Sequence, residues 1–473
     1  MLYNRRMISK TRQTFRRRRR LYTLAGVVML VILGVGIYFI PPIRIRVDNR
    51  LDTLRTQIKY LINPPENVVF VPTQRSQTAT PAATVTPTRT PIPDLPTASP
   101  TITSTPLPTA VKMTNIVYAN QCNRWNYCGP ANLTMALKYW GWKGLAGSEL
   151  SDGRDQISSI IKPGENDMSK DFIERGKSDF GIMPYEMVDF VNDYTSYRAL
   201  SRYGGDVELL HRMIAAGFPV VIEKGYYQRD NTGRVSWMGH YSFVTGYDDV
   251  AKNFIWQDSY PNRCADQEHP EIVEKKGRDN LITFDDLLNA WRGFDYIFVV
   301  VYPPEREGDV MQALGPWADA QWAAQHAREI AESETKSMTG NDEFFAWFNL
   351  GTSNVALQQY ADAAGAFDQA FTLYAALSND NSQRPYRILW YETGPYWAYF
   401  YTGRYVDVVT LADKTLYDLT SRPSLEESLY WRAMAEYALG QYDAAYSDIR
   451  SAVYYNRNMQ VALARMQEWG ISP

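Results

Sequence analysis

Histidine and cysteine are scarce in this chain, which has four histidines and three cysteines among 473 residues. The histidines are scattered and no Cys-x-x-Cys pair occurs, so a zinc site or another metal centre is not expected. Charge of one sign is not in excess, because 49 Lys and Arg face 52 Asp and Glu, a formal net charge of −3. Such a balance favours neither nucleic acid nor a strongly acidic partner. We therefore expect no metal, no cofactor and no nucleic-acid partner.

Charge is missing altogether from Leu21 to Ile40. About twenty apolar residues are what a helix needs to span the ~30 Å hydrocarbon core of a bilayer. A cleaved signal peptide and a buried helix are the alternatives. The run exceeds the usual apolar core of a signal peptide, however, and Pro41-Pro42 follows it rather than an Ala-x-Ala cleavage site. The sequence predicts one transmembrane helix over residues 21–41.

Basic residues flank this run unequally. The tail of residues 1–20 is rich in arginine and ends in the run Arg16 to Arg20, whereas few arginines follow at a comparable distance: Arg44, Arg46, Arg50 and Arg55. Cytoplasmic flanks carry the excess of Lys and Arg. We expect a single-pass protein of the cell membrane, with a cytoplasmic tail and everything after the span outside the cytoplasm.

Two segments of simple composition follow the span. Residues 42–71 resemble a short amphipathic stalk, since apolar residues recur at helical spacing: Leu51, Leu54, Ile58, Leu61 and Ile62. Residues 72–112 are dominated by Thr and Pro, cannot bury a core, and predict a disordered, extended linker. At ~3 Å per residue, such a linker would hold the next domain as much as ~100 Å from the bilayer.

Cys128 begins the run Cys-Gly-Pro-Ala-Asn-Leu-Thr-Met-Ala-Leu-Lys-Tyr-Trp-Gly, which has the pattern of a buried helix. Pro130 suits a first helical turn, apolar residues then recur at helical spacing, and Gly141 predicts the end. Cys128 would thus lie at a helix N-terminus, where the dipole and the unpaired backbone N–H groups favour thiolate over thiol. Most cysteines are small core hydrophobes, so further residues must support a nucleophile.

Three residues complete a candidate catalytic set with Cys128. His240 opens the strand-like run His-Tyr-Ser-Phe-Val-Thr-Gly-Tyr, and Asp258 ends the next one, Phe-Ile-Trp-Gln-Asp. A base and its orienting acid at the ends of neighbouring strands, opposite a cysteine on a helix, form the geometry of a thiol triad. Gln121, seven residues before Cys128, is within reach of an oxyanion hole.

Other residues of these types are weaker candidates. Asn126 could replace Gln121 as the amide, and Asp248 or Asp249 could replace Asp258 as the acid. The remaining histidines lie on an apolar helix, in a polar loop and in the later helical region: His211, His269 and His326. His240 is therefore the base by elimination as well as by motif.

The segment that carries these residues predicts an α+β domain. A helix over 207–216 precedes a buried strand over 218–224, and β-branched and aromatic residues mark strands over 240–247, 252–258 and 296–302. Helices first and an antiparallel sheet afterwards are typical of the α+β class.

These motifs resemble the papain-like superfamily, and more closely cysteine peptidase family 39, the bacteriocin-processing or double-glycine peptidases, with their broad 39-like relatives. The similarity is carried by the Cys128 helix, by Gly239-His240-Tyr-Ser-Phe-Val-Thr-Gly-Tyr, by Gln257-Asp258-Ser259, and by the helix and strand over 284–303. It covers residues 113–304. The resemblance implies a cysteine peptidase that acts on a peptide or protein substrate through the Cys128, His240 and Asp258 triad, with Gln121 at the oxyanion.

The chain departs from that family in three ways. The spacing from Gln121 to Cys128 is one residue longer than usual, and Asp258 is followed by serine where proline is frequent. Members that process double-glycine leaders are usually fused to an ABC transporter. Here no array of membrane helices occurs, and Gly176-Lys177-Ser178 lacks the earlier glycine of a phosphate-binding loop, with Asp171 in its place. Double-glycine leaders are therefore not an implied substrate.

The other two cysteines suggest a disulfide. Outside the cytoplasm the compartment is oxidising in many organisms. If Cys122 and Cys264 pair, the odd cysteine left over is Cys128, the free thiol that the triad requires.

Residues 315–473 show continuous helical periodicity with three similar segments. They are Leu357-Gln-Gln-Tyr360-Ala, Tyr401-Thr-Gly-Arg-Tyr405-Val and Leu439-Gly-Gln-Tyr442-Asp, each preceded by an aromatic-rich helix. The pattern resembles the tetratricopeptide repeat, whose stacked helix pairs form a concave surface. One interpretation is a docking platform for a protein partner; the other is a helical cap that only supports the enzyme.

The sequence thus predicts a membrane-anchored, extracytoplasmic thiol hydrolase, a cysteine peptidase, with C-terminal helical repeats. Two alternatives stay open. A transglutaminase or amidase would use the same triad, and a catalytically silent binding module on the cell surface would use the same fold.

Overall fold

The computed structural model describes residues 22–23, 25–26, 29, 34, 36–73, 106–122, 126–163, 181–229, 235–261, 270–378, 384–420 and 423–472. The chain divides into two compact units, Met1–Asn63 and Pro64–Pro473. In the first unit, α2 (Pro41–Ile62) starts at the proline pair and covers most of the predicted stalk. No helix within the described ranges is both long and apolar enough to cross a membrane. The basic tail 1–20 and most of the predicted span 21–41 lie outside the described residues.

The second unit contains a seven-stranded antiparallel sheet with the strand order β2-β7-β3-β4-β5-β6, and β1 pairs with β4. The strands are β1 (Ala110–Lys112), β2 (Arg198–Arg202), β3 (Val220–Arg229), β4 (Val235–Asp248), β5 (Asn253–Gln257), β6 (Asn280–Thr283) and β7 (Phe298–Tyr302). The predicted strands correspond to β3, β4, β5 and β7. The sequence analysis missed β1, β2 and β6, which are short and carry little apolar alternation.

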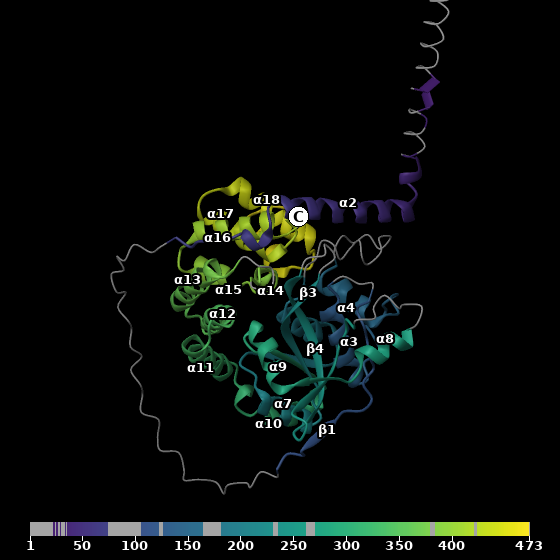
Figure 1. Cartoon of the computed structure of the whole chain (residues 1–473), viewed down its shortest axis with the longest axis vertical. Coiled ribbons are helices and arrows are strands. Elements are labelled where there is room, and N and C mark those ends of the chain that lie inside the picture. The colour runs from purple at the N-terminus through teal and green to yellow at the C-terminus, as the bar shows by residue number, and fades with distance from the viewer. Residues whose placement is uncertain are drawn as a thin grey trace, which may run out of the picture. The chain divides into compact units, whose positions relative to one another are not determined.

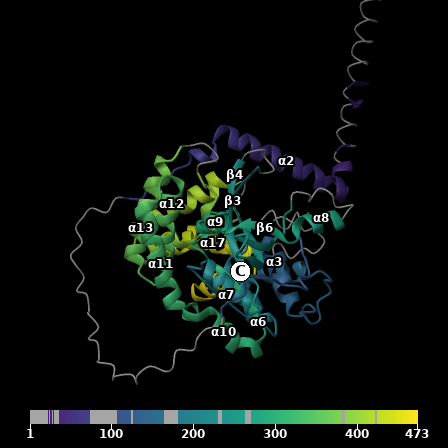
Figure 2. The ribbon, with the colours of Figure 1, turned by 60° about the horizontal axis from the view of Figure 1, so that its bottom comes forward.

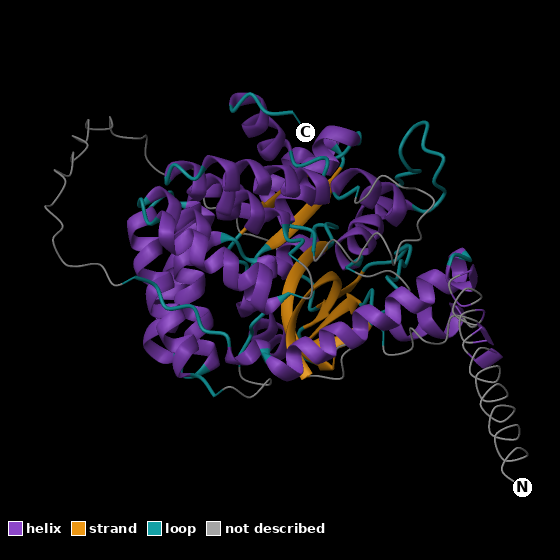
Figure 3. Ribbon diagram, turned by 90° about the horizontal axis from the view of Figure 1, so that it is seen from above, coloured by secondary structure: helices purple, strands orange, loops and turns teal. Residues whose placement is uncertain are grey.

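Helices cover this sheet on either side, as Figure 3 shows. The helices in this part of the chain are α3 (Cys128–Tyr139), α4 (Gly153–Ile161), α6 (Pro184–Tyr194), α7 (Val207–Ala215), α8 (Pro270–Gly277), α9 (Phe284–Trp291) and α10 (Glu307–Leu314). Of these, α3, α6, α7 and α9 contact strands of the sheet directly. Polar caps set two of the starts, because Asp206 accepts a hydrogen bond from Leu209 N and Thr283 accepts one from Asp286 N. We call residues 106–319 the sheet lobe, and its α+β class is the one predicted.

Residues 320–472 form an all-helical lobe. Its helices are α11 (Ala320–Ser337), α12 (Asn341–Ala356), α13 (Tyr360–Ala376), α14 (Ile388–Tyr391), α15 (Gly394–Tyr401), α16 (Tyr405–Asp413), α17 (Glu426–Ala438), α18 (Tyr442–Tyr455) and α19 (Gln460–Glu468). Successive long helices pack against each other, and α11, α12 and α13 lie on the same side of β3 and β4 in Figures 1 and 2. We call this the helical lobe.

The three similar sequence segments adopt one turn geometry. Gln358, Gly403 and Gly440 each have a positive φ, of 59°, 74° and 79°. The next residue in each segment donates its N–H to the carbonyl five residues back: Gln359 to Asn354, Arg404 to Tyr399 and Gln441 to Glu436. A new helix then begins at each of the aligned tyrosines. The helical repetition predicted from the sequence is therefore present in the backbone.

The two lobes share a hydrophobic core rather than meeting at a linker. Trp237, Phe294 and Ile297 of the sheet lobe belong to the apolar cluster of the helical lobe. Conversely, Ala323 of the helical lobe belongs to the core of the sheet lobe, and Ile330 packs against that core. The predicted boundaries at 304 and 315 thus fall inside continuous packing.

Residues 64–73, which we expected in the stalk and linker, instead pack on the helical lobe. Phe70 is 5% exposed and its ring lies 5.0 Å from that of Phe371. Thr73 donates to Asp407 from its N–H at 2.9 Å and from its hydroxyl at 2.7 Å. Since β1 holds the other end in the sheet, both ends of the Thr/Pro-rich segment are attached to one compact unit. That segment, residues 74–105, lies outside the described residues.

This arrangement predicts that cutting the Thr/Pro-rich segment does not release the downstream lobes. With a protease recognition sequence inserted after residue 90 of the full-length chain, we expect the two cleaved fragments to co-elute in size-exclusion chromatography. Burial of Phe70 holds them together, and losing a buried phenylalanine costs about 3–5 kcal/mol. The same insertion combined with Phe70→Asp should give fragments that separate. Separation without the Phe70 change would contradict the prediction.

Candidate active site

Cys128 lies at the N-terminus of α3, where the sequence placed it. Residues 129–137 of this helix are buried, which fixes the helix against the sheet, while Cys128 itself is only half-buried and is a free thiol. The side chain of Asn132, one turn later, donates to the Cys128 carbonyl oxygen at 2.8 Å. Cys122 is disulfide-bonded, as expected, and its predicted partner Cys264 lies outside the described residues.

His240 and Asp258 are brought together by the pairing of β4 with β5. Phe243 of β4 lies opposite Gln257 of β5. Continued by one residue, this antiparallel register brings Asp258 to within two positions of His240, so the two side chains lie on the same face of the sheet. His240 Nε2 lies 3.1 Å from Asp258 Oδ1, and His240 is 5% exposed. The same carboxylate oxygen accepts the N–H of Tyr260 at 2.9 Å, which fixes its orientation.

The thiol of Cys128 and the imidazole of His240 each shift the pKa of the other. Because Asp258 engages Nε2, the other ring nitrogen, Nδ1, is the one left for Cys128. Burial opposes ionisation of the thiol, but His240 and the backbone N–H groups of Tyr241 and Gly129 outweigh it, so the pKa of Cys128 lies below its ordinary value. Burial likewise disfavours the imidazolium, yet Asp258 and Cys128 raise the pKa of His240 to about 9. A lowered thiol pKa beside a raised imidazole pKa favours the thiolate–imidazolium pair.

Lys224 is a further charged group at the carboxylate. It lies opposite His240 on β3 and is buried, with its ammonium 4.2 Å from the ring centroid of Trp256. Burial acts to raise the pKa of Asp258, but the hydrogen bond to His240 and, to a smaller degree, the charge of Lys224 hold it below its ordinary value. Asp258 therefore stays ionised and orients the imidazole.

Gln121 is held in place by Ser259. The Gln121 N–H donates to the Ser259 carbonyl at 2.7 Å, and the Ser259 hydroxyl donates to Gln121 Oε1 at 3.0 Å. Asn132 Nδ2 lies 3.3 Å from the same hydroxyl oxygen, so a polar chain links the nucleophile helix to Gln121. With Oε1 engaged, Gln121 presents its Nε2 amide as the donor. Sequence reasoning treated Ser259 only as a departure from the family pattern and did not single out Asn132.

This chain of contacts predicts an effect for Ser259. We expect Gln121→Ala to lower kcat by on the order of 10²-fold, the cost of losing one oxyanion donor, and Ser259→Ala to lower it by a smaller factor because the amide is then less well oriented. Ser242→Ala is the matched control, since its hydroxyl is buried on β4 with no hydrogen-bond partner. The measurement is kcat and KM for all three variants. Equal kcat values for Ser259→Ala and Ser242→Ala would contradict the positioning role.

The weaker candidates lie elsewhere or engage other partners. Asp248 accepts the N–H groups of Val250 and Ala251 at a turn, and Asp249 faces His211 at 3.6 Å, so neither orients His240. Asn126 adopts φ 55° two residues before Cys128. His326 stacks on Trp322 in the helical lobe. His269 lies outside the described residues.

The helical lobe contributes to the same site. The hydroxyl of Tyr391, the last residue of α14, accepts the backbone N–H of Gly239, the residue before His240. Its ring lies 5.9 Å from Phe294, and a Cβ on Gly239 would come within 2.6 Å of Phe294 Cζ, so only glycine fits there. Sequence reasoning missed Tyr391, because no local signal connects it to a residue so far away in the chain.

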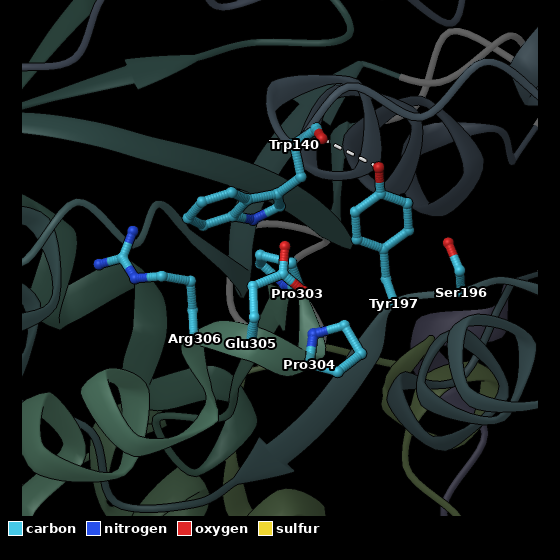
Figure 4. A pocket seen from close by; sticks show the side chains of 7 residues that line it. All are labelled: Trp140, Ser196, Tyr197, Pro303, Pro304, Glu305 and Arg306. Carbon is cyan, nitrogen blue, oxygen red and sulfur yellow. Dashed lines mark hydrogen bonds between the residues drawn. The ribbon is translucent and has the colours of Figure 1, made fainter.

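A surface pocket of 480 Å³ lies apart from this site. It is lined by Trp140, Ser196, Tyr197, Pro303, Pro304, Glu305 and Arg306, and Tyr197 donates to the Trp140 carbonyl at 2.9 Å (Figure 4). Trp140 follows the C-terminus of α3, the opposite end of a helix of 12 residues from Cys128. Such a helix is ~18 Å long, so this pocket does not hold a substrate for the thiol.

A thiol, an imidazole and a carboxylate thus meet on the antiparallel sheet of an α+β lobe. Residues 113–278 match the model of the Peptidase C39 like family, and that range includes all three groups. No curated protein matches the chain. A crystal structure of a C39-like peptidase from Bacillus anthracis matches with 16% identity over 41% of this chain and 96% of its own, at a TM-score of 0.27, and so weak a likeness carries no argument.

Proposed function

We propose that this protein is a membrane-anchored, extracytoplasmic cysteine peptidase that cleaves peptide bonds of a peptide or protein substrate. The observation that carries the proposal is the hydrogen bond from His240 to Asp258 together with the mutual effect of His240 and Cys128, which lowers the thiol pKa and raises the imidazole pKa. A charged thiolate beside an imidazolium is the activated form of a cysteine nucleophile. The match of residues 113–278 to a peptidase family supports the same activity.

The mechanism follows from the protonation state. The Cys128 thiolate attacks the carbonyl carbon of the scissile amide, and the negative charge moves to the carbonyl oxygen. The Cys128 N–H and the Gln121 amide stabilise that oxyanion. His240 gives its proton to the leaving amine, which departs and leaves a thioester on Cys128. His240, now neutral, takes a proton from water; the hydroxide attacks the thioester and restores the thiolate.

The proposal also places the enzyme at the membrane, with its catalytic unit outside the cytoplasm. The charge-free segment Leu21 to Ile40 supports an anchor, and the arginine-rich tail before it supports a cytoplasmic N-terminus. The disulfide at Cys122 favours an oxidising compartment.

We also propose that the helical repeats are tetratricopeptide-like and dock a protein partner. The three equivalent turns support the repeat assignment. Trp397 and Tyr401 remain 37% and 53% exposed and stack on each other at 5.9 Å, which supports a docking surface. Amphipathic aromatic side chains of this kind are enriched at protein interfaces.

The test uses the purified full-length chain and a peptide library, read by mass spectrometry. Cleavage products that require Cys128, and are absent with Cys128→Ala, would establish a peptidase. If a glutamine amide is exchanged for an added amine and the chain is not cleaved, the enzyme is a transglutaminase rather than a peptidase. If no Cys128-dependent product of either kind forms, the catalytically silent binding module is the interpretation that remains.

A further inference from the structure

The residue two positions before α6 packs directly beside the proposed nucleophile. Ile182 is 5% exposed, and its carbonyl oxygen accepts a hydrogen bond from the Tyr241 hydroxyl at 2.7 Å. Its side chain lies against Gly129, since a Cβ placed on Gly129 would come within 3.2 Å of Ile182 Cβ. Ile182 therefore contacts both the residue after Cys128 and the residue after His240.

Gly129 and Tyr241 are also the residues whose backbone N–H groups favour the thiolate. Both N–H groups act to lower the pKa of Cys128. Asn132 ties the same residues together, because its amide donates to the carbonyl oxygen of Cys128 at 2.8 Å and to that of Tyr241 at 3.0 Å. A displacement of Ile182 would therefore move the backbone donors relative to the sulfur.

Glu186 holds the backbone on the other side of Ile182. Its Oε2 atom accepts the N–H of Met183 at 2.8 Å, and its side chain is 10% exposed. Because Met183 directly follows Ile182, this N–H and the Ile182 carbonyl belong to one planar peptide group. We call it the 182–183 peptide. Its carbonyl accepts from Tyr241 and its N–H donates to Glu186, so both of its polar atoms are fixed.

Glu186 is itself held at the junction of the two lobes. Lys162, which follows α4, lies 3.6 Å from Glu186 and 2.7 Å from Glu426 at the start of α17. The side-chain amide of Asn456, at the end of α18, lies 3.3 Å from Glu426 Oε1 and 3.5 Å from Glu186 Oε1. Residues of the helical lobe thus help to place the carboxylate that holds the 182–183 peptide.

We propose that Glu186 is a positioning residue for Cys128, which acts through the 182–183 peptide on the backbone donors that surround the thiol. The catalytic consequence rests on the peptidase function proposed above, whereas the effect on the thiol can be measured without a substrate. Precise placement matters because a displacement of about 1 Å can cost on the order of 10²-fold in rate. The helical lobe then reaches the nucleophile by a second route, separate from the contact of Tyr391 with Gly239.

The first test measures the thiol alone. In the full-length chain, alkylation of Cys128 by iodoacetamide is followed against pH by peptide mass spectrometry. In Glu186→Ala we expect the pH midpoint of the rate to rise by about one unit, and the rate at pH 6 to fall about tenfold, because the Tyr241 N–H is no longer held at the sulfur. Lys162 keeps Glu426 and Glu427 as partners, so the variant should fold.

Two further variants separate the hydrogen bond from the charge. Glu186→Gln retains an acceptor for the Met183 N–H and should keep the wild-type alkylation profile. Glu186→Asp keeps the charge but is one methylene shorter, so it should resemble Glu186→Ala. If Glu186→Ala does not fold, Glu186→Asp alone decides. A wild-type profile in Glu186→Asp, or a shifted profile in Glu186→Gln, would overturn the positioning role.

Asp206→Ala is the matched control for the loss of a helix cap. Asp206 is an acid of the same lobe that accepts the N–H of Leu209 at 2.6 Å, but it holds the start of α7 rather than the 182–183 peptide. We expect it to lower the melting temperature about as much as Glu186→Ala and to leave the alkylation profile unchanged. A shift of equal size in Asp206→Ala would show that a loss of stability alone explains the effect.

The second test uses a peptide whose cleavage requires Cys128. We expect kcat to fall by about 10–10²-fold in Glu186→Ala with little change in KM, since the 182–183 peptide holds the nucleophile rather than the substrate. Glu186→Gln should restore kcat. Full kcat in both Glu186→Ala and Glu186→Asp would leave the peptidase standing and overturn the positioning role. A shifted alkylation profile in Glu186→Ala, with no peptide cleaved by the wild type, would retain the positioning role and overturn the peptidase.

Discussion

Replacing His240 with alanine is expected to lower kcat by on the order of 10³–10⁴-fold, since the residue supplies both the base and the acid of the proposed mechanism. The physical reason lies in the thiol. Burial alone raises the pKa of Cys128, and the hydrogen bond and charge of His240 are what bring it below its ordinary value. In His240→Ala only the burial effect and the backbone donors remain, so the thiolate should be scarce at neutral pH.

The rate of Cys128 alkylation should depend on pH, and differently in the wild type and in His240→Ala. Wild-type Cys128 should be alkylated rapidly at pH values well below the ordinary thiol pKa of ~8.5, and the rate should change again near pH 9, where His240 loses its proton. In His240→Ala the rate should instead rise only at alkaline pH. His326→Gln, which alters a histidine in the helical lobe, serves as the control. Identical pH profiles for the wild type and His240→Ala would show that the pair is not assembled.

Replacing Lys162 with methionine is expected to destabilise the protein by about 3–5 kcal/mol, the usual cost of removing one partner from a buried ion pair. Lys162 follows α4 of the sheet lobe and is 3% exposed. Its ammonium lies 2.7 Å from Glu426 and 3.5 Å from Glu427, at the start of α17, and 3.6 Å from Glu186. Without it, three carboxylates remain buried together at the junction of the lobes.

This loss of stability should depend on pH. Burial raises the pKa of Glu186 well above its ordinary value, so the folded state favours its neutral form. The resulting stabilisation is complete below the unfolded pKa, near pH 4.3, and is lost as pH rises above it. Denaturant unfolding should therefore show a larger deficit for Lys162→Met at pH 8 than at pH 5. Adding Glu426→Gln should restore part of the loss, whereas the exposed Lys276→Met should cost little. A deficit that does not change with pH would argue against the ionic explanation.

The packing of residues 64–73 on the helical lobe also bears on N-terminal truncation of the chain. The packing of Phe70 and Thr73 on the helical lobe shows that a fragment starting near residue 111 lacks part of that lobe. Measurements on the full-length chain are therefore the relevant ones.

Local patterns predicted the nucleophile helix and the strands that carry the base and the acid. Pro130, the apolar spacing after it and Gly141 define α3 within one stretch of chain, and the β-branched runs define β4 and β5. Helix starts and alternating strands depend on neighbouring residues, so the position of Cys128 at a helix N-terminus and of His240 on a strand could be predicted from the sequence. The three repeated turns were also visible, because each is a short local signal.

Contacts between distant residues could not be predicted in this way. Ser259 positions Gln121 across 138 residues, and Phe70 returns to a helix some 300 residues later. The short strands β1 and β6 likewise form only because β4 and β5 offer them open edges. Such contacts depend on which apolar faces bury one another when the whole chain folds, a long-range balance that no short window of sequence contains. The chemistry at Cys128 is thus encoded locally, whereas the groups that orient it, such as Ser259 beside Gln121, are brought together only when the whole chain folds.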